Sequence, residues 1–241
     1  MRYTGNTILI TGGSSGIGLA LAERFLTLGN EVIICGRREK SVTDVKKRFP
    51  KIHTFISDTG DEKSRLELVN DVTRQFPHAN ILINNAGIQN KVELTKLESW
   101  KDLRQEILIN VEGPMHLSML FIPHFLKLKS SCIINVSSGL AFSPLANVPI
   151  YCATKAAIHS FTLSLRFQLK ETPIEVVEII PPAVRTNLGG SHDFGTPLDE
   201  YADSVIDQLN EGRSETTYEF SAKSSQASRA ELDQIFKSMN K

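Results

Sequence analysis

The stretch Thr7–Gly18, TILITGGSSGIG, decides the fold that this sequence predicts. It joins a short β-branched run to a glycine-rich turn, and helical periodicity follows at once over Gly16–Leu28. In such a turn Gly12 allows tight bending, Gly16 lets the main chain approach a pyrophosphate, and Gly18 lets the helix pack on the strand. The free N–H groups at the helix start would face the phosphates. A glycine turn that binds nothing is the alternative, and the flanking strand and helix weaken it. The candidate phosphate-binding residues are Gly12, Ser14, Ser15, Gly16, Ile17 and Gly18.

The rest of the chain alternates β-branched runs with amphipathic stretches, a pattern typical of βαβ units around a parallel sheet. We predict an α/β, Rossmann-type doubly wound sheet of about seven strands with helices on both faces. The expected strands are Thr7–Thr11, Glu31–Cys35, Ile52–Ile56, Asn80–Asn84, Ser131–Val136, Ile174–Ile180 and Glu215–Phe220. The expected helices are Gly16–Leu28, Glu39–Phe49, Asp61–Phe76, Leu97–Leu128, Tyr151–Lys170 and Ala227–Asn240, with Pro114 and Pro123 bending the fourth. Residues 187–212 should form a mobile loop and helix at the substrate.

The composition of the chain restricts its domain number, its location and the kinds of partner that it can bind. The chain has 241 residues, which suits one domain spanning residues 1–241. Lys plus Arg and Asp plus Glu are 27 each, so no global charge attracts nucleic acid or an anionic membrane. No apolar run is long enough for a membrane span, and no secretory segment is visible, so we expect a cytoplasmic protein with reduced cysteines. The six histidines are scattered, and we expect no metal site.

The end of the second expected strand selects the cofactor. NAD-binding folds place an acid there, about 20 residues past the glycines, to hold the ribose 2′-hydroxyl. Here that place is taken by Gly36, followed by Arg37 and Arg38. The missing carboxylate removes repulsion against a 2′-phosphate, and Arg37 can bind one through a forked, charge-assisted hydrogen bond. We therefore expect NADP(H) in preference to NAD(H). A solvated charge pair at a helix start is the alternative.

A phenol and an ammonium lie one helical turn apart at Tyr151 and Lys155, on one helix face. This pair follows the fifth expected strand, whose carboxyl end carries Ser138. A nearby ammonium favours the phenolate of a tyrosine, so that the phenol can serve as an acid and base. The hydroxyl of Ser138 could orient a carbonyl oxygen, and the cofactor would supply hydride. These residue types predict carbonyl or alcohol chemistry on a small molecule.

Together these motifs resemble the short-chain dehydrogenase/reductase family, over Asn6 to about Thr186. Within it, the glycine turn, the segment after Ser138 and the Tyr151–Lys155 motif are similar to those of bacterial DltE-type oxidoreductases. The resemblance implies that Asp58 lies near the adenine and that Lys155 bridges the ribose hydroxyls. It implies that Asn110 holds a water leading protons to Lys155. Residues implied to line the cofactor cleft or hold the nicotinamide amide are Asn85, Ala86, Gly87, Val184 and Thr186.

Two departures from the family pattern stand out. The usual Pro-Gly after the sixth strand is Pro181-Pro182, which stiffens the turn that holds the nicotinamide end. A C-terminal Asp-Gly-Gly segment typical of the family is missing, which argues against the usual tetramer contact. We expect a homodimer that pairs the Leu97–Leu128 and Tyr151–Lys170 helices.

Several alternatives stay open at this stage. A non-catalytic NADP(H)-sensing protein would share the fold, although it would not need the Ser138, Asn110, Tyr151 and Lys155 set. A sugar-nucleotide epimerase shares the Tyr/Lys pair but needs a longer C-terminal domain. Leu140, Phe142 and Leu145 suit an apolar substrate pocket or the core equally well. His159 and Cys152 are interpreted as packing residues.

Overall fold

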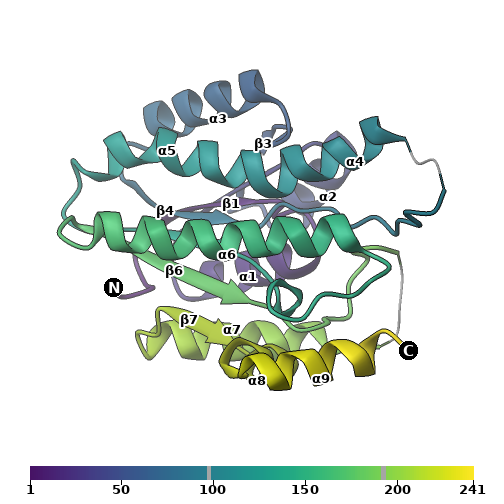
Figure 1. The fold of residues 1–241 in the computed structure, drawn as a ribbon. Helices are drawn as coiled ribbons and strands as arrows, with labels where there is room; N and C mark the ends of the chain where they lie inside the picture. Colours follow the sequence, from purple (N-terminus) through teal and green to yellow (C-terminus); the bar gives the residue numbers. More distant parts are fainter. Residues whose placement is uncertain (97–98, 191–193) are drawn as a thin grey trace.

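The protein folds around a seven-stranded parallel sheet, and helices cover both of its faces (Figure 1). The computed structural model describes residues 1–96, 99–190 and 194–241. Its strands are β1 (Thr7–Thr11), β2 (Glu31–Gly36), β3 (His53–Ile56), β4 (Ala79–Asn84), β5 (Ser131–Val136), β6 (Ile174–Ile180) and β7 (Glu215–Thr217). They lie in the order β3-β2-β1-β4-β5-β6-β7, and every neighbouring pair is parallel. The predicted Rossmann-type sheet is confirmed.

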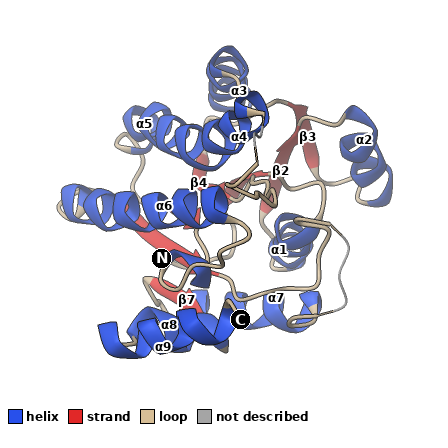
Figure 2. Ribbon diagram, turned by 45° about the vertical axis from the view of Figure 1, so that its right-hand side comes forward, coloured by secondary structure: helices blue, strands red, loops and turns tan. Residues whose placement is uncertain are grey.

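The helices form two layers. They are α1 (Gly16–Thr27), α2 (Glu39–Arg48), α3 (Glu62–Gln75), α4 (Trp100–Ile107), α5 (Gly113–Phe125), α6 (Pro149–Leu169), α7 (Leu198–Asn210), α8 (Phe220–Gln226) and α9 (Arg229–Met239). Helices α3, α5 and α6 cover one face of the sheet, and α1, α2 and α7 cover the other (Figures 1 and 2).

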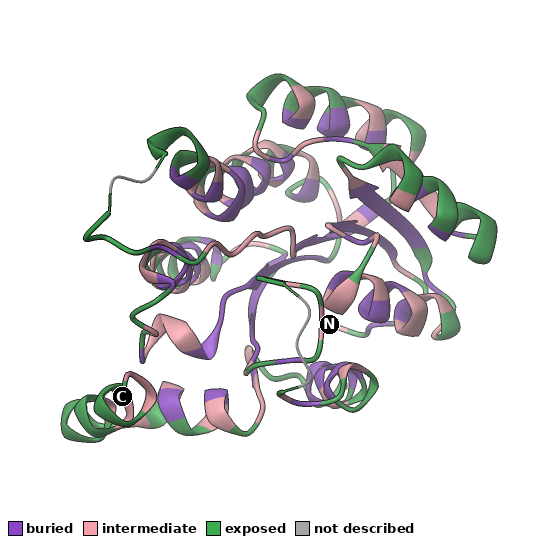
Figure 3. Ribbon diagram, turned by 90° about the vertical axis from the view of Figure 1, so that its right-hand side faces the viewer, coloured by how far each residue is buried: buried purple, intermediate pink, exposed green. Residues whose placement is uncertain are grey.

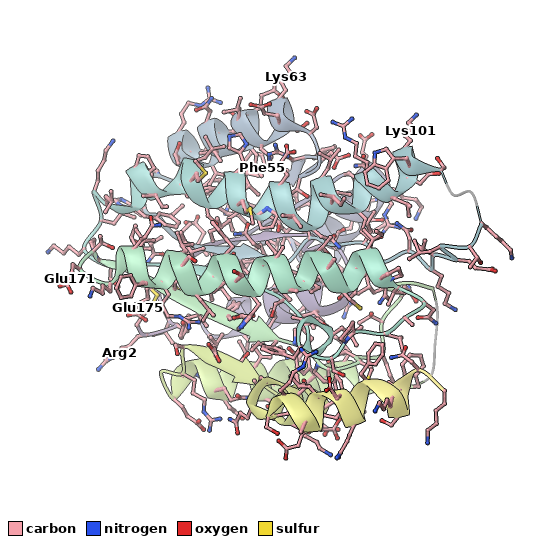
Figure 4. All side chains as sticks on the ribbon, viewed as in Figure 1. Arg2, Phe55, Lys63, Lys101, Glu171 and Glu175 are labelled. Carbon is pink, nitrogen blue, oxygen red and sulfur yellow. The ribbon has the colours of Figure 1, made fainter. Side chains whose placement is uncertain are left out.

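Alternate side chains along each strand build the two cores. In β1, Ile8 and Ile10 pack with α1 and α7, while Leu9 packs with α3, α5 and α6. Because strand side chains point to opposite faces in turn, a strand covered on both sides must be apolar throughout. The sheet is accordingly buried at the centre of the molecule and the outer helix faces are exposed (Figure 3). Charged side chains such as Lys63, Lys101 and Glu171 project outward from the surface (Figure 4).

The long helix expected over Leu97–Leu128 is broken into three parts. Helix α4 ends at Ile107, a π-helical turn covers Leu108–Glu112, and α5 begins at Gly113. Pro114 has no N–H to donate to the carbonyl of Asn110, four residues earlier, so a regular α-helical ladder cannot pass this point. The bend expected at Pro114 thus takes the form of a π-turn, and Pro123 lies near the end of α5. The expected start at Leu97 lies outside the described residues.

The last strand, β7, ends at Thr217. The prediction of a strand over Glu215–Phe220 was therefore wrong for its second half. The side chain of Gln208 bonds both the N–H and the carbonyl of Thr217, which ends β7. Glu219 then adopts a φ of 46°, a left-handed conformation, and α8 begins at Phe220. Within residues 187–212 the chain forms α7, and residues 191–193 of that range lie outside the described part. No helix among the described residues is long and apolar enough to cross a membrane.

Candidate active site

The glycine turn after β1 is packed so closely that three of its positions, Gly12, Gly13 and Gly18, admit no side chain. A Cβ on Gly18 would lie 2.3 Å from Nδ2 of Asn85, and one on Gly12 would lie 2.9 Å from Cα of Ala86. Asn85 Nδ2 donates to the carbonyl of Thr11 at 2.8 Å, and the N–H of Ala86 donates to the Thr11 hydroxyl at 3.0 Å. The segment after β4 therefore fixes the turn, and the strands lie adjacent where the sheet order reverses.

The surroundings of this turn fit a dinucleotide. Helix α1 begins at Gly16 with no side-chain cap, so its first N–H groups are left for a ligand. The methyl of Thr186 lies 3.5 Å from where a Cβ of Gly16 would be, which brings the segment after β6 to the turn. The hydroxyl of Ser14 would lie 3.1 Å from a Cβ on Gly36, so exposed Arg37 follows directly beside the turn. The glycine turn, the uncapped start of α1 and the segment after β6 thus lie together at this edge of the sheet.

The other candidate cofactor residues lie on the same edge of the sheet. Asp58 follows β3 and accepts a hydrogen bond from the N–H of Gly60 at 2.9 Å. Val184 is buried and forms an isolated β-bridge with Thr196. Ser15 precedes α1 in extended conformation, and Ile17 lies in its first turn.

Ser138, Tyr151 and Lys155 meet at the carboxyl end of β5. Ser138 starts a 3₁₀ turn, and its hydroxyl accepts the N–H of Leu140 at 3.1 Å. The Lys155 ammonium donates to the carbonyl of Val136 at 2.8 Å and lies 5.5 Å from the centre of the Tyr151 ring. All three side chains are buried. The sequence-predicted set is thus brought to one place by β5 and α6.

Burial controls the charge of this set. Burial raises the pKa of the Tyr151 phenol well above its ordinary value, and hydrogen bonding with Ser138 acts in the opposite direction. Burial also lowers the pKa of Lys155 to about 8, against the carboxylates of Glu106 and Glu178, which raise it. The raised pKa keeps the phenol protonated, so that it can donate a proton.

Asn110 joins the two sides of the site. It lies in the π-helical turn, a kind of irregularity that is frequent at functional sites. Its Oδ1 accepts the N–H of Ile88 at 2.9 Å, and its Nδ2 donates to the Ile88 carbonyl and to the Thr154 hydroxyl. A Cβ on Gly87 would lie 3.4 Å from Asn110 Oδ1 and 3.8 Å from Lys155 Nζ. Gly87 thus leaves the approach to Lys155 open.

Comparison with known proteins agrees with this geometry. Residues 6–193 match the family model for short chain dehydrogenases. The chain belongs to this family. It is also 46% identical to the oxidoreductase DltE of Bacillus subtilis strain 168, over all of this chain and 98% of that protein. The expected likeness to DltE-type oxidoreductases is confirmed, and the protein is an oxidoreductase of the short-chain dehydrogenase family.

Solved structures share the fold. A short chain dehydrogenase of Burkholderia cenocepacia in complex with NADP superposes with a TM-score of 0.84 at 23% identity, covering 98% of this chain and 99% of that one. One from Burkholderia phymatum in complex with NAD gives a TM-score of 0.80 at 20% identity, covering 90% and 89%. At this identity the likeness concerns the fold.

This short-chain dehydrogenase also has a buried polar network that our sequence reasoning missed. Glu178 in β6 is fully buried, accepts the hydroxyl hydrogen of Ser137, and contacts Nδ1 of His159 at 3.0 Å. The hydrogen bond to Glu178 raises the pKa of His159. His159 also packs edge-on against Phe142. It is therefore a charge partner for a buried acid as well as a packing residue.

A second buried acid, Glu106, lies near Tyr151 and Lys155. Glu106 of α4 accepts a hydrogen bond from Asn90 Nδ2 at 3.1 Å, and its other oxygen has no partner among the described residues. Burial raises its pKa. A signal for Glu178 existed in the sequence, because an acid inside an apolar strand covered on both faces must find a partner. For Glu106 no such signal existed, since one polar residue per helical turn is ordinary.

Proposed function

We propose that this short-chain dehydrogenase is an NADP(H)-dependent oxidoreductase that interconverts a carbonyl and an alcohol, with Tyr151 as the acid and base. The observation that carries the proposal is the meeting of Ser138, Tyr151 and Lys155 beside Gly87. Such a meeting of a phenol, an ammonium and a hydroxyl suits proton transfer to a carbonyl oxygen. A sensor that only binds cofactor needs none of them.

Each residue has a separate task in the proposed reduction. Tyr151 donates its proton to the carbonyl oxygen, and Ser138 orients that oxygen through its hydroxyl. Lys155, with its positive charge near the ring, favours the phenolate that is left. Asn110 keeps Ile88 and Thr154 in place and holds a water that leads protons toward Lys155. When bound, NADPH supplies the hydride.

Arg37 is the proposed determinant for NADP(H). It is exposed and directly follows Gly36, where an acid that prefers NAD(H) would stand. A guanidinium there binds the 2′-phosphate with about 10- to 100-fold gain in affinity. The other proposed cofactor contacts are Gly12, Ser14, Ser15, Gly16, Ile17, Gly18, Asp58, Asn85, Ala86, Gly87, Tyr151, Lys155, Val184 and Thr186.

We further propose a cytoplasmic homodimer of single-domain subunits, paired through α5 and α6, in which the described part of residues 187–212 forms a loop and helix at the substrate. The two helices lie side by side on one face of the molecule (Figure 1). Met119 on α5 and Phe167 on α6 are 63% and 70% exposed. Large apolar side chains gathered on one face are typical of subunit interfaces.

One experiment tests the activity and separates it from cofactor sensing. Reduction of a panel of aldehydes and ketones is followed at 340 nm for wild type, Tyr151→Phe and the matched control Tyr218→Phe. We expect Tyr151→Phe to lose roughly 10²- to 10⁴-fold in kcat/KM, the usual contribution of a general acid. NADPH affinity should stay nearly unchanged, and Tyr218→Phe should behave as wild type. A panel without any Tyr151-dependent turnover would favour the sensor.

The same preparations test the cofactor. Fluorescence titration with NADPH and NADH compares wild type, Arg37→Ala and Arg38→Ala. We expect wild type to prefer NADPH and Arg37→Ala to lose about 10- to 100-fold of that preference. Equal affinities for both cofactors in wild type would refute the assignment.

A further inference from the structure

A small apolar cluster lies directly beside Tyr151, apart from the two cores that flank the sheet. Val148, Tyr151 and Cys152 form its buried part, and Leu140, Leu145 and Leu188 pack on them while remaining only half-buried. These leucines come from three separate segments: the turn after β5, the loop before α6 and the segment after β6. Apolar side chains that stay partly exposed next to a reactive group can contact a ligand there.

The loop that carries Leu145 is held through its main chain by a residue beside Tyr151. The N–H of Leu145 donates to Sγ of Cys152 at 3.3 Å, and the Cys152 thiol donates to the Leu145 carbonyl at 3.7 Å. Cys152 is buried and free of any disulfide. Its thiol thus joins Leu145 to the helix that positions the phenol.

The same loop is held from its other side by the residue that follows α9. The N–H of Ala146 donates to Oδ1 of Asn240 at 2.6 Å, and Asn240 Nδ2 donates to the carbonyl of Pro144 at 3.1 Å. Asn240 Nδ2 also donates to the carbonyl of Phe236 at 2.8 Å, which ties the contact to the last turn of α9. A single amide therefore bonds the main chain on both sides of Leu145.

Helix α9 contributes no buried residue of its own. A capping box of Ser228 and Glu231 fixes its start, and Asn240 attaches its end to the loop before α6. A helix normally docks on a protein because the contact buries apolar surface of the helix. Leu232, Ile235 and Met239 of α9 are only half-buried, so the hydrogen bonds from Asn240 to the loop add a specific contact at its end.

We propose that Leu145 contacts an apolar substituent of the carbonyl substrate, and that Asn240 and Cys152 are positioning residues that hold it there. The inference rests on the proposed function, and it names the substrate class as carbonyl compounds with an alkyl or similar apolar group. Leu140 and Leu188 complete the apolar wall. Cys152 and Asn240 act only through Leu145.

The test compares linear aldehydes of increasing chain length with NADPH as reductant. Each methylene that leaves water against Leu145 should raise kcat/KM about two- to fourfold in wild type. In Asn240→Ala, as in Leu145→Ala, the gain in kcat/KM per methylene should fall toward a factor of one. In Asn240→Ala the kcat/KM for the shortest aldehyde and the affinity for NADPH should change little. Ser238→Ala is the matched control, because its hydroxyl bonds only the Ile235 carbonyl of the same helix.

A second readout does not depend on turnover. Hydrogen exchange of the Ala146 amide should become at least tenfold faster in Asn240→Ala, because its acceptor is gone. Exchange of the Val92 amide, which donates to the carbonyl of Asn147, serves as the internal reference. Asn240→Asp keeps the acceptor for Ala146 and should restore most of its protection.

The outcomes separate this inference from the proposed function. Wild type without Tyr151-dependent turnover would refute the proposed function and the inference with it, although exchange at Ala146 would still test the Asn240 contact. The inference alone would be overturned if wild type is active but its gain in kcat/KM per methylene is near one. It would also be overturned if that gain is the same in wild type and Asn240→Ala. Unchanged exchange at Ala146 would overturn it as well.

Discussion

The proposed cofactor side and the proposed substrate side of the molecule are built in different ways. On the cofactor side, from β1 to Gly87, main-chain geometry and glycine determine the shape: the turn closes on Asn85 and Ala86, and Gly12, Gly13 and Gly18 have no space for a side chain. On the substrate side, from Ser137 to Asn240, polar side chains join segments far apart in sequence. Asn240 bonds Ala146 across 94 residues, and Ser137 bonds Glu178 across 41.

The difference has a physical reason. A pyrophosphate and a ribose are constant, so their site can be made of main chain and small residues that fit a single shape. A substrate wall is made of side chains, which can be exchanged without disturbing the sheet. We therefore expect substitutions on the substrate side to lower stability by breaking buried polar contacts. Substitutions on the cofactor side should lower stability because the added side chains overlap with neighbouring atoms.

The largest effect should follow from breaking the buried pair on the substrate side. His159→Ala leaves fully buried Glu178 with Ser137 as its remaining hydrogen-bond partner. Removing one partner of a buried ion pair costs about 3–5 kcal/mol, because a charge is left buried without compensation. Urea unfolding at pH 6 measures this cost. The exposed His78→Ala is the control, and a loss below 1 kcal/mol in His159→Ala would contradict the charge pairing.

The same pair should make stability depend on pH. Its hydrogen bond to Glu178 raises the pKa of folded His159 above the unfolded value of about 6.5. The stabilisation is therefore complete below about pH 6.5 and is lost as pH rises through the folded pKa. We expect the stability difference between wild type and Glu178→Gln to shrink from pH 6 to pH 9. A constant difference would mean that His159 stays neutral.

A smaller effect is expected from crowding on the cofactor side. Gly18→Ala places a Cβ 2.3 Å from Nδ2 of Asn85, so the turn must shift. Overpacking of this kind costs about 1–3 kcal/mol, and NADPH binding should weaken because the first turn of α1 moves. Thermal unfolding and NADPH titration measure both. Gly29→Ala is the control, since a Cβ there meets nothing within 4 Å and only the φ of 78° is strained. NADPH affinity equal to wild type in Gly18→Ala would argue against this turn as the phosphate site.

The smallest effect comes from two matched helix caps. Asp61 accepts the N–H of Ser64 at the start of α3, and Ser228 accepts that of Glu231 at the start of α9. Asp61→Ala should cost about 1 kcal/mol of global stability, since α3 buries Leu68 and Val72 against the sheet. Ser228→Ala should cost much less in the same unfolding experiment, because no residue of α9 is fully buried and the helix can fray by itself. Equal losses would show that α9 is part of the cooperative core.

Local pattern predicted most of the fold. The first, fifth and sixth strands have the expected bounds, and the glycine turn lies where the strand and helix signals placed it. Ser138, Tyr151 and Lys155 converge as the spacing implied. The sequence predicted a bend at Pro114 but not its π-helical form, and it did not predict the early end of β7, which depends on hydrogen bonds between Thr217 and the side chain of Gln208 in α7.

The sequence by itself determined which residues form strands, where the chain turns, and which family the protein belongs to, because these follow from periodicity and from glycine positions. Only the tertiary structure decided that Glu178 is paired with His159 and that Asn240 holds the loop of Leu145. Partners of buried polar groups are chosen by the packing of helices on the sheet, which brings together side chains that no local pattern relates.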